Sequence, residues 1–466
     1  MTRGAHRASA SGPAALPRRP FAIPDELTCY FDAPAEPSNI HLEMLVPGRL
    51  DPQAFRAAAI AALAANFRAS SRRVPHGPLS RSYAWEHPAS LDIDPVSFAS
   101  FATADELDRL RADFISTSPS IDVAPPARLL LASGPGHDCV MLNAHHAAMD
   151  GLSWLELLRA IGRRYRSGIQ ASAAGEAQPG ADPQPAAPPV TSPAAATAGD
   201  VDAPGPVPRP RARRPGLPAR IAPDGGGQAG YGLRLILLPG VPSAPELSPG
   251  SKATLNEALV TALIAAIGRW NAERGRPVRV VRITTPFNAR AAGGQRSAGN
   301  LSRLVTIAAI PPAPGVGLTP LLQEVARQTR AARSRPGPQV GGGSRSLAVA
   351  FLPVTAKRAA IRLALRTAGP LVCDTAMLTN LGNVPDPPDF GQPGPITMAF
   401  TAQAQMPRGL TVGVITAGGQ LQLAVRYNRA LFGEAAAEQF GTALMRALDE
   451  VTSTAPDHAG VTASQV

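Results

Sequence analysis

Residues 171–230 separate this chain of 466 residues into two parts. The stretch consists mainly of Pro, Ala, Gly and Ser, and it has almost no large apolar side chains. It cannot bury enough apolar surface to offset the entropy lost on ordering, and a structureless insert of this length is common only between domains. We therefore predict a linker at 171–230 between an N-terminal lobe, 21–170, and a C-terminal lobe, 231–452. The flanking residues 1–20 and 453–466 are predicted to be a disordered N-terminus and a flexible tail.

The N-terminal lobe mixes strands with helices. Asp51 stands at an N-cap position in front of a proline and an Ala-rich segment, and Thr103 and Glu106 have the spacing of a capping box. The Gly- and Pro-containing residues 133–136 lie between two short apolar runs, which predicts a hairpin. The predicted strands are 41–46, 127–132 and 139–143, and the predicted helices are 52–65, one that follows Thr103, and 153–166.

The C-terminal lobe has the same mixed character. Thr254 and Glu257 form a second capping-box pattern in front of a long apolar helix, and residues 417–420 predict a tight hairpin. Strands and helices do not alternate regularly in either lobe, so an α+β fold is favoured over a doubly wound sheet. The predicted strands are 233–238, 278–284, 304–310, 377–381, 396–400, 410–415 and 421–427, and the predicted helices are 254–271, 319–334 and 434–448, with an irregular Gly-rich span before residue 377.

The composition excludes several classes of protein. Hydrophobic residues make up 44% of the chain, which is enough for a sizeable core and too much for a wholly disordered protein. We expect no membrane-spanning helix and no secretory signal, because no uncharged apolar run is long enough and the N-terminus has no apolar core segment. Cys29, Cys139 and Cys373 are too far apart to indicate a disulfide framework or a zinc knuckle. These features favour a cytoplasmic location.

The formal net charge of +11 raises the question of nucleic-acid binding. Nearly all of the basic residues are arginine, since Lys252 and Lys357 are the only lysines, and this imbalance is typical of a GC-rich coding sequence. The basic residues are dispersed except in the Pro-rich stretch 209–220, and aromatic residues, at 5%, are too sparse to stack bases. We therefore expect no nucleic-acid partner. The charge is compatible with attraction of phosphate-bearing small molecules or an acidic protein.

The segment Asn143–Gly151 contains two adjacent histidines between a predicted strand and a predicted helix. A neutral imidazole has a pKa near 6.5, so it is well suited to accept a proton at neutral pH. Adjacent residues of an extended segment point in opposite directions, so His145 and His146 cannot both face one reacting atom. We expect one histidine to be catalytic and the other to be structural.

Two other interpretations of the histidines stay open. Both could be hydrogen-bonded polar groups at the end of a strand, with no chemical role. They could also bind a metal ion together with Asp150. The extended geometry separates the two rings and no cluster offers a third ligand, so we expect no metal site.

The pattern His-His-x-x-x-Asp-Gly is the signature of the chloramphenicol acetyltransferase-like acyltransferases, and this chain resembles that family. The family includes nonribosomal peptide condensation domains, wax ester synthases and polyketide-associated acyltransferases. The resemblance implies two chloramphenicol acetyltransferase-like lobes that form a V-shaped pseudo-dimer with a central channel. It extends, in the right order, over a strand–motif–helix unit, a second-lobe opening, a strand end near the channel and a closing hairpin and helix: 126–170, 254–300, 379–382 and 417–440.

The resemblance assigns roles to the motif residues. His146, the second histidine, is implied as the general base that takes a proton from the acceptor hydroxyl or amine. His145 and Asp150 are implied as structural residues, with Asp150 paired to a distant arginine. Arg290 matches that arginine best, although it could also be a solvated loop residue.

Four further residues are implied as parts of the substrate site. Gly151 would allow the pantetheine arm of the donor to approach closely, and its backbone N–H could hold the developing oxyanion. Asn300, Asn380 and Gly382 are implied to lie along the channel.

The implied activity is transfer of an acyl group from a coenzyme A or carrier-protein thioester to an alcohol or amine. The phosphopantetheinyl thioester is then a substrate, and no bound cofactor is expected. No Gly-x-Ser-x-Gly nucleophile elbow is present, so we expect direct transfer without an acyl-enzyme. The alternative is a non-catalytic scaffold of the same fold that binds a carrier protein or an acyl chain.

The subfamily stays open. Residues 21–27 do not match the openings of wax ester synthases or peptide condensation domains, and Asp389-Phe390-Gly391 is not followed by the Trp-Gly of plant-type members. With no carrier-protein serine motif or adenylation motif in the sequence, we expect a free-standing monomer that receives both substrates in trans.

Overall fold

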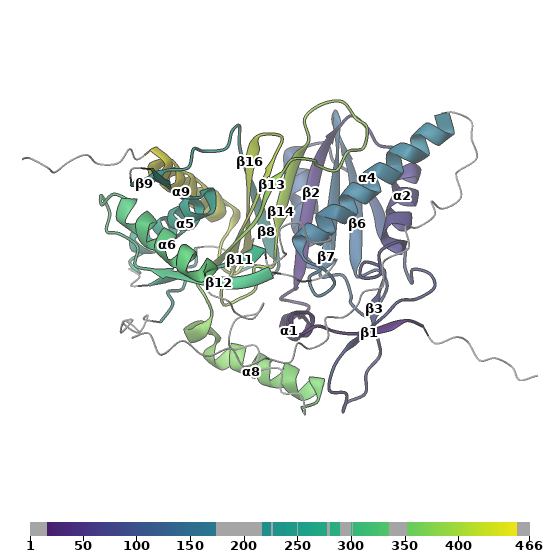
Figure 1. The fold of residues 1–466 in the computed structure, drawn as a ribbon, viewed down its shortest axis with the longest axis horizontal. Helices are drawn as coiled ribbons and strands as arrows, with labels where there is room; N and C mark the ends of the chain where they lie inside the picture. Colours follow the sequence, from purple (N-terminus) through teal and green to yellow (C-terminus); the bar gives the residue numbers. More distant parts are fainter. Residues whose placement is uncertain are drawn as a thin grey trace, which may run out of the picture.

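The computed structural model describes residues 16–173, 217–224, 227–248, 250–276, 280–288, 300, 302–334 and 352–453. Two mixed lobes lie side by side, each built on its own sheet (Figure 1). The helices and strands of the first half are β1 (Arg18–Pro20), α1 (Ile23–Phe31), β2 (Asn39–Pro47), α2 (Pro52–Ala64), β3 (Arg72–Arg73), β4 (Ala84–Glu86), β5 (Val96–Ser100), α3 (Ala104–Ser116), β6 (Ala127–Gly134), β7 (His137–His145) and α4 (Gly151–Ala173).

The second half contributes most of the other lobe. Its elements are β8 (Tyr231–Leu238), β9 (Glu246–Ser248), β10 (Ser251–Lys252), α5 (Leu255–Glu273), β11 (Val281–Asn288), β12 (Ser302–Ala309), α6 (Thr319–Arg333), α8 (Val354–Val372), β13 (Ala376–Val384), β14 (Thr397–Thr401), β15 (Leu410–Ala417), β16 (Gln420–Asn428) and α9 (Glu434–Ser453).

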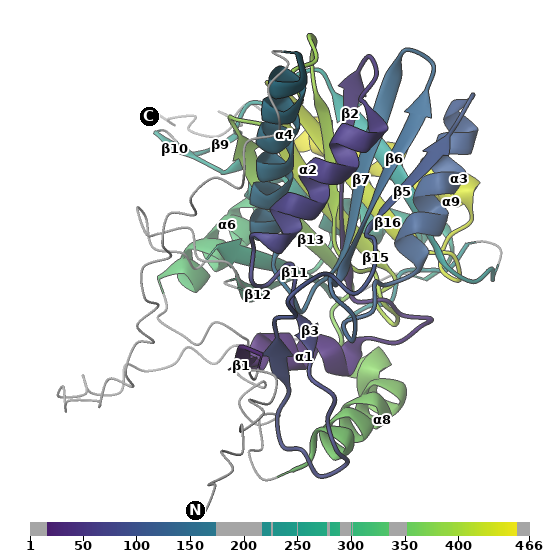
Figure 2. The same ribbon diagram turned by 90° about the vertical axis from the view of Figure 1, so that its right-hand side faces the viewer.

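The N-terminal sheet has five strands in the order β14-β2-β7-β6-β5. Alternation along the strands gives it two apolar faces. Leu129 and Leu142 face the core that includes α2 and α4, whereas Leu130 and Met141 face α3. Figure 2 shows α2 and α4 crossing the same side of this sheet. Helix α2 begins as expected, because the Asp51 carboxylate accepts a hydrogen bond from the Ala54 N–H at 2.7 Å.

The C-terminal sheet has six strands in the order β12-β11-β13-β15-β16-β8. Helices α5, α6 and α9 contribute apolar side chains to one core with the inward-facing residues of this sheet. The predicted capping box of α5 is present: Thr254 accepts from the Glu257 N–H at 3.2 Å, and Glu257 accepts from the Thr254 N–H at 2.7 Å. The α+β expectation therefore holds in both lobes.

One strand of the N-terminal sheet comes from the second half of the chain. β14 belongs to the second half of the chain, yet it pairs antiparallel with β2 of the N-terminal sheet, with Phe400 opposite Leu42. The strand passes so close to β15 that a Cβ on Gly413 would lie 1.8 Å from the Phe400 carbonyl oxygen. Only glycine fits there. The lobe limits predicted from the sequence did not anticipate this position of β14.

Most of the expected elements are present, but two helices and several short strands were missed. β5 belongs to the five-stranded sheet, and β1, which pairs with β4, lies at the end of the 1–20 stretch that was expected to be disordered. α1 is short and has no side-chain N-cap, and α8 lies in the span that was expected to be irregular. The described ends of the predicted linker are ordered: α4 continues to Ala173, and Ile221 and Ala222 are buried in the C-terminal core. Residues 174–216 lie outside the described residues, so the linker itself stays a prediction.

A buried arginine ties the second lobe to the first. Arg426, on β16, is fully buried and donates to the Asn39 side-chain oxygen at 2.7 Å and to the Ile115 carbonyl at 2.9 Å. Its guanidinium also lies over the Tyr231 ring, 4.8 Å from the centroid. Burial lowers the pKa of Arg426 to about 10, so the side chain is still charged at neutral pH.

We expect Arg426→Leu to lower the free energy of unfolding by about 2 to 5 kcal/mol, because the buried Asn39 side-chain oxygen loses its donor and the Ile115 carbonyl keeps only the Asn39 amide. The matched control is Arg234→Leu on β8, which removes an exposed ion pair with Glu438. That change should cost less than about 1 kcal/mol. Chemical denaturation measures the free energy of unfolding of both variants. Equal effects of the two substitutions would contradict the role of Arg426 in joining the lobes.

Candidate functional site

The two histidines lie in a tight turn between β7 and α4. β7 ends at His145, and the Ala148 N–H donates to the His145 carbonyl at 3.0 Å. Asp150 then caps α4, because its carboxylate accepts from the Ser153 N–H at 3.1 Å and from the Ser153 hydroxyl at 2.9 Å. The Asp-Gly end of the motif therefore starts a helix directly after the histidine pair.

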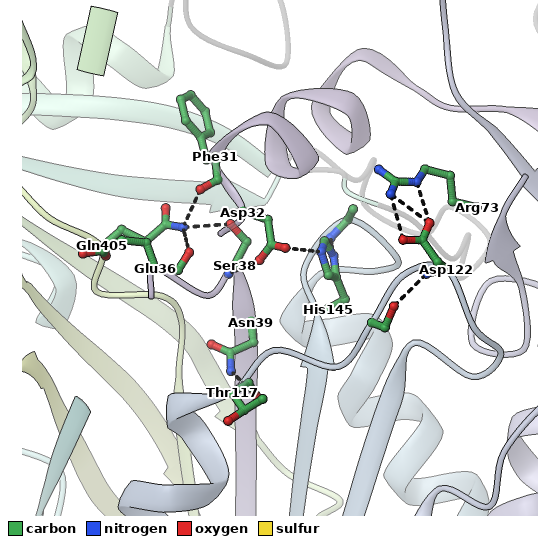
Figure 3. A network of polar contacts seen from close by, with 12 residues as sticks. Phe31, Asp32, Glu36, Ser38, Asn39, Arg73, Thr117, Asp122, His145 and Gln405 are labelled. Atoms are coloured by element: carbon green, nitrogen blue, oxygen red, sulfur yellow. Dashed lines mark hydrogen bonds and ion pairs between the residues drawn. The ribbon is translucent and has the colours of Figure 1, made fainter. Parts of the chain in front are cut away.

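His145 is held on both sides of its ring. Its Nδ1 accepts a hydrogen bond from the Ala147 N–H at 3.1 Å, and its Nε2 lies 3.6 Å from a carboxylate oxygen of Asp32 (Figure 3). Burial raises the pKa of Asp32, but His145 and the Ser38 N–H outweigh burial and leave that pKa below its ordinary value. Because Nδ1 is an acceptor, the proton of neutral His145 is on Nε2, facing Asp32.

His146 has a different environment. Its backbone N–H donates to the Ser38 carbonyl at 2.8 Å, and the residue keeps partial exposure to solvent. Among the described residues, its Nδ1 has no hydrogen-bond partner. Burial lowers the pKa of His146 below the ordinary histidine value of 6.5, so the ring is neutral at pH 7. The two rings differ in exposure, but among the described residues His145 Nε2, like His146 Nδ1, accepts or donates no hydrogen bond. The expectation of one structural and one reactive histidine therefore stays a prediction.

Three side chains from distant parts of the chain hold the backbone of the turn. Arg68 donates to the Ala148 carbonyl at 2.8 Å and to the Ala147 carbonyl at 3.0 Å. Asn300, from the second half of the chain, donates to the His146 carbonyl at 2.9 Å. Both donors also bind the buried Asp25 carboxylate, Arg68 at 2.6 Å and Asn300 at 2.9 Å. We call Asp25, Arg68 and Asn300 the turn clamp.

The segment between α1 and β2 connects the histidines to the second lobe. The Gln405 side-chain amide donates to the Phe31 carbonyl at 3.1 Å and to the Ser38 hydroxyl at 3.0 Å, as Figure 3 shows. Glu36 accepts from the Tyr231 hydroxyl at 2.6 Å. Burial raises the pKa of Glu36. The segment that contacts both histidines is therefore held by residues of the second half of the chain.

Gly151 has a packing reason to be glycine. A Cβ at this position would lie 2.6 Å from the Phe400 ring on β14 and 2.9 Å from Leu381 on β13. Phe400 and Leu381 therefore occupy the space next to the Gly151 Cα, where the pantetheine arm was expected to approach. The predicted role of the Gly151 N–H stays a prediction. Arg290 lies outside the described residues, so its pairing with Asp150 also stays a prediction.

The three predicted channel residues lie in two separate places. Asn300 is part of the turn clamp, next to His146. Asn380 and Gly382 instead line a cavity of about 690 Å³ at the end of β13, where the Gly382 N–H donates to the Asn380 side-chain oxygen at 2.7 Å. His146 is not among the residues that line this cavity.

Sequence reasoning missed several residues around the histidines. Asp25 and Asp32 belong to α1 and its C-terminal end. Pro24 and the acidic residues Asp25 and Glu26 in the first turn are the signals that could have identified this helix. Arg68 was one arginine among many. Within the described part of the chain, no group of three or more His, Cys, Asp and Glu side chains could hold a metal ion. No helix in that part is long and apolar enough to cross a membrane.

Comparison with known proteins places the fold. No protein-family model matches the sequence. Uncharacterised proteins of two strains of Mycobacterium tuberculosis are 26% identical over 435 residues, which cover 88% of this chain and 94% of theirs.

Among solved structures, the first condensation domain of the calcium-dependent antibiotic synthetase, in complex with a substrate analogue, matches with a TM-score of 0.57 and 16% identity, over 90% of this chain and 92% of that one. A starter condensation domain variant of rhizomide synthetase RzmA, in complex with C8-CoA and Leu-SNAC, matches with a TM-score of 0.56 and 15% identity, over 93% of each chain. The epimerization domain from the third module of tyrocidine synthetase B matches with a TM-score of 0.56 and 13% identity, over 95% of this chain and 98% of that one. The chain has the condensation-domain fold, and the expected two-lobe α+β architecture is confirmed.

We expect Gly151→Ala to destabilise the protein by about 1 to 3 kcal/mol, because the added methyl group would overlap Phe400 and Leu381. Gly168→Ala is the matched control in the same helix, since a Cβ there meets no atom within 4 Å. It should be neutral or stabilise by up to about 1 kcal/mol through helix propensity. Thermal denaturation compares the melting temperatures of the two variants. An unchanged melting temperature in Gly151→Ala would show that Gly151 is not tightly packed against Phe400 and Leu381.

Proposed function

We propose that this chain, which has the condensation-domain fold, transfers an acyl group from a thioester to an alcohol or amine with His146 as the general base. The observation that carries the proposal is the state of that side chain. His146 is partly exposed, its pKa is lowered by burial, and its backbone is bound by Ser38 and Asn300. A neutral, oriented imidazole is the group needed to accept a proton at neutral pH.

The chemistry requires one proton acceptor and a good leaving group. The acceptor oxygen or nitrogen attacks the thioester carbonyl while its proton passes to Nε2 of the His146 imidazole, since Nδ1 is buried. The tetrahedral oxyanion then collapses, the C–S bond breaks, and the thiolate takes the proton back from the imidazolium. The sequence has no Gly-x-Ser-x-Gly elbow, which supports direct transfer without an acyl-enzyme.

The other motif residues have supporting roles in this proposal. His145 and Asp150 shape the turn and the start of α4, and Arg290 pairs with Asp150. The backbone N–H of Gly151 is the candidate donor to the oxyanion. The cavity lined by Asn380 and Gly382 is the candidate space for part of a substrate.

The donor is proposed to be coenzyme A or a carrier-protein thioester, used as a substrate rather than as a bound cofactor. A complex with C8-CoA and Leu-SNAC is known for the RzmA variant of the same fold, and this supports an acyl thioester as the donor here. The same fold also occurs in an epimerization domain, so the proposal depends on the histidine site and not on the fold alone.

We expect His146→Ala to lower turnover by about a hundred- to ten-thousand-fold, since it removes the general base. The assay is thiol release from a panel of acyl-coenzyme A donors with alcohol or amine acceptors. His137→Ala, at the opposite end of β7, is the matched control and should keep normal activity. Full activity in His146→Ala, with an unchanged melting temperature, would show that His146 is not the general base. Absence of thiol release from the wild-type protein with every pair would favour the non-catalytic scaffold.

The pH dependence of kcat/KM provides a separate test of the base. The pKa of His146 is lowered, so the imidazole stays neutral until the pH falls below 6.5. Activity should therefore be constant near pH 7 and should fall on acidification, with a midpoint below 6.5. An acidic limb with its midpoint above 6.5 would contradict a buried histidine base.

A further inference from the structure

Helix α8 and a neighbouring loop form one unit at an end of the molecule. The Val354 N–H donates to the Ser80 carbonyl at 2.8 Å, the Thr355 hydroxyl donates to the Pro78 carbonyl at 3.0 Å, and Lys357 Nζ donates to the Arg81 carbonyl at 2.8 Å. Both ribbon views show α8 beside α1, beyond the ends of the two large sheets (Figures 1 and 2). We call residues 74–82 and 354–372 the basal unit.

The outer face of α8 carries unusual side chains for a surface helix. Val354, Lys357, Ile361 and Gly369 are buried on the inner face. The solvent face of a surface helix is normally polar or charged. Here Leu363 is 63% exposed and Leu371 is 51% exposed, and four other exposed positions of the helix are alanine: Ala356, Ala359, Ala360 and Ala364.

The loop that binds the N-terminal end of α8 carries a further exposed leucine. Leu79 is 80% exposed, which is the largest exposure among the large hydrophobic side chains of the described residues. The exposed cations Arg81, on the loop, and Arg366, on the helix, belong to the same unit. The basal unit contains Arg81, Lys357, Arg358, Arg362 and Arg366 and has no Asp or Glu in its sequence. The exposed side chains of the basal unit are therefore mainly apolar or positively charged.

The sign of the charge and the shape of the surface decide between possible occupants. A second copy of this chain, docked symmetrically on the same face, would bring arginine against arginine, which is unfavourable. Leu79, Leu363 and Leu371 are each more than half exposed, and they belong to one loop and one helix. Exposed apolar side chains beside arginines match the interface of an anionic bilayer, where the side chains enter the headgroup region and the cations meet phosphate.

We propose that the basal unit binds the surface of an anionic lipid membrane, with Leu79, Leu363 and Leu371 inserted and Arg81 and Arg366 at the headgroups. The binding does not depend on the proposed function. The basal unit nevertheless lies next to the histidine site, because Arg358 and Arg362 donate to the Asp32 carbonyl at 3.1 and 2.7 Å, and the Asp32 carboxylate faces His145.

The test is flotation of the purified full-length protein with lipid vesicles. We expect binding to vesicles of phosphatidylcholine and phosphatidylglycerol, little binding to phosphatidylcholine alone, and a loss of binding as salt is added. The variant with Leu363→Asp and Leu371→Asp should lose affinity by about tenfold or more, and so should the variant with Arg81→Glu and Arg366→Glu. Leu237→Asp is the matched control, since Leu237 is 47% exposed on β8 of the six-stranded sheet, and it should bind like the wild type.

Three outcomes would overturn the proposal. They are no binding of the wild type to the anionic vesicles, an equal loss in Leu237→Asp, and unchanged binding in both double variants. Circular dichroism and melting establish that each variant is folded, and the charge-reversal pair concerns exposed side chains only. A dimer that dissociates in the leucine variant, seen by light scattering without any vesicle binding, would assign this face to a second copy instead.

Discussion

The carbonyl groups of residues 146–148 depend on side chains from elsewhere in the chain. A strand-to-helix turn leaves these acceptors without partners in its own secondary structure, and a buried carbonyl without a donor is costly. Arg68 and Asn300 supply the donors, and Asp25 holds both of them. Because Asn300 comes from the second half of the chain, the His146 carbonyl has this donor only when both halves are folded together.

Other contacts between the halves follow the same logic. Arg426 is a buried cation that satisfies acceptors of the first lobe, and Gln405 binds the segment that contacts both histidines. Buried polar groups of this kind add little net stability, but each one penalises any arrangement in which its partner is displaced. The lobes are thereby fixed relative to one another around the histidine pair.

The sequence predicted those parts of the fold that local chemistry determines. Capping residues such as Asp51 and Thr254, and the hairpin at residues 417–420, identified elements whose signals lie within a few residues. It failed where the signal is not local. α8 was missed because it follows a Gly-rich stretch, has no side-chain N-cap and contains Gly369 and Pro370 near its end, so the usual signals of a helix start and a helix interior are absent.

The site shows the same division. The His-His-x-x-x-Asp-Gly signature located the turn. The N-cap made by Asp150 is also a local feature, because its partner Ser153 is three residues away. Asp25, Asp32 and Arg68 could not be identified, because nothing in their own neighbourhoods distinguishes them from other surface charges. Their importance arises from tertiary contacts, which one sequence without its fold does not reveal.

The position of β14 has a consequence for how the protein is made. Until residue 401 has left the ribosome, β2 lacks the neighbour that it has in the finished sheet, and its backbone N–H and C=O groups form an open edge. An N-terminal half produced alone would keep that edge, and it would be free to pair with any other extended segment. The first lobe of this chain is therefore complete only after translation of most of the second, so the nascent N-terminal part is the stage at which aggregation is most favoured.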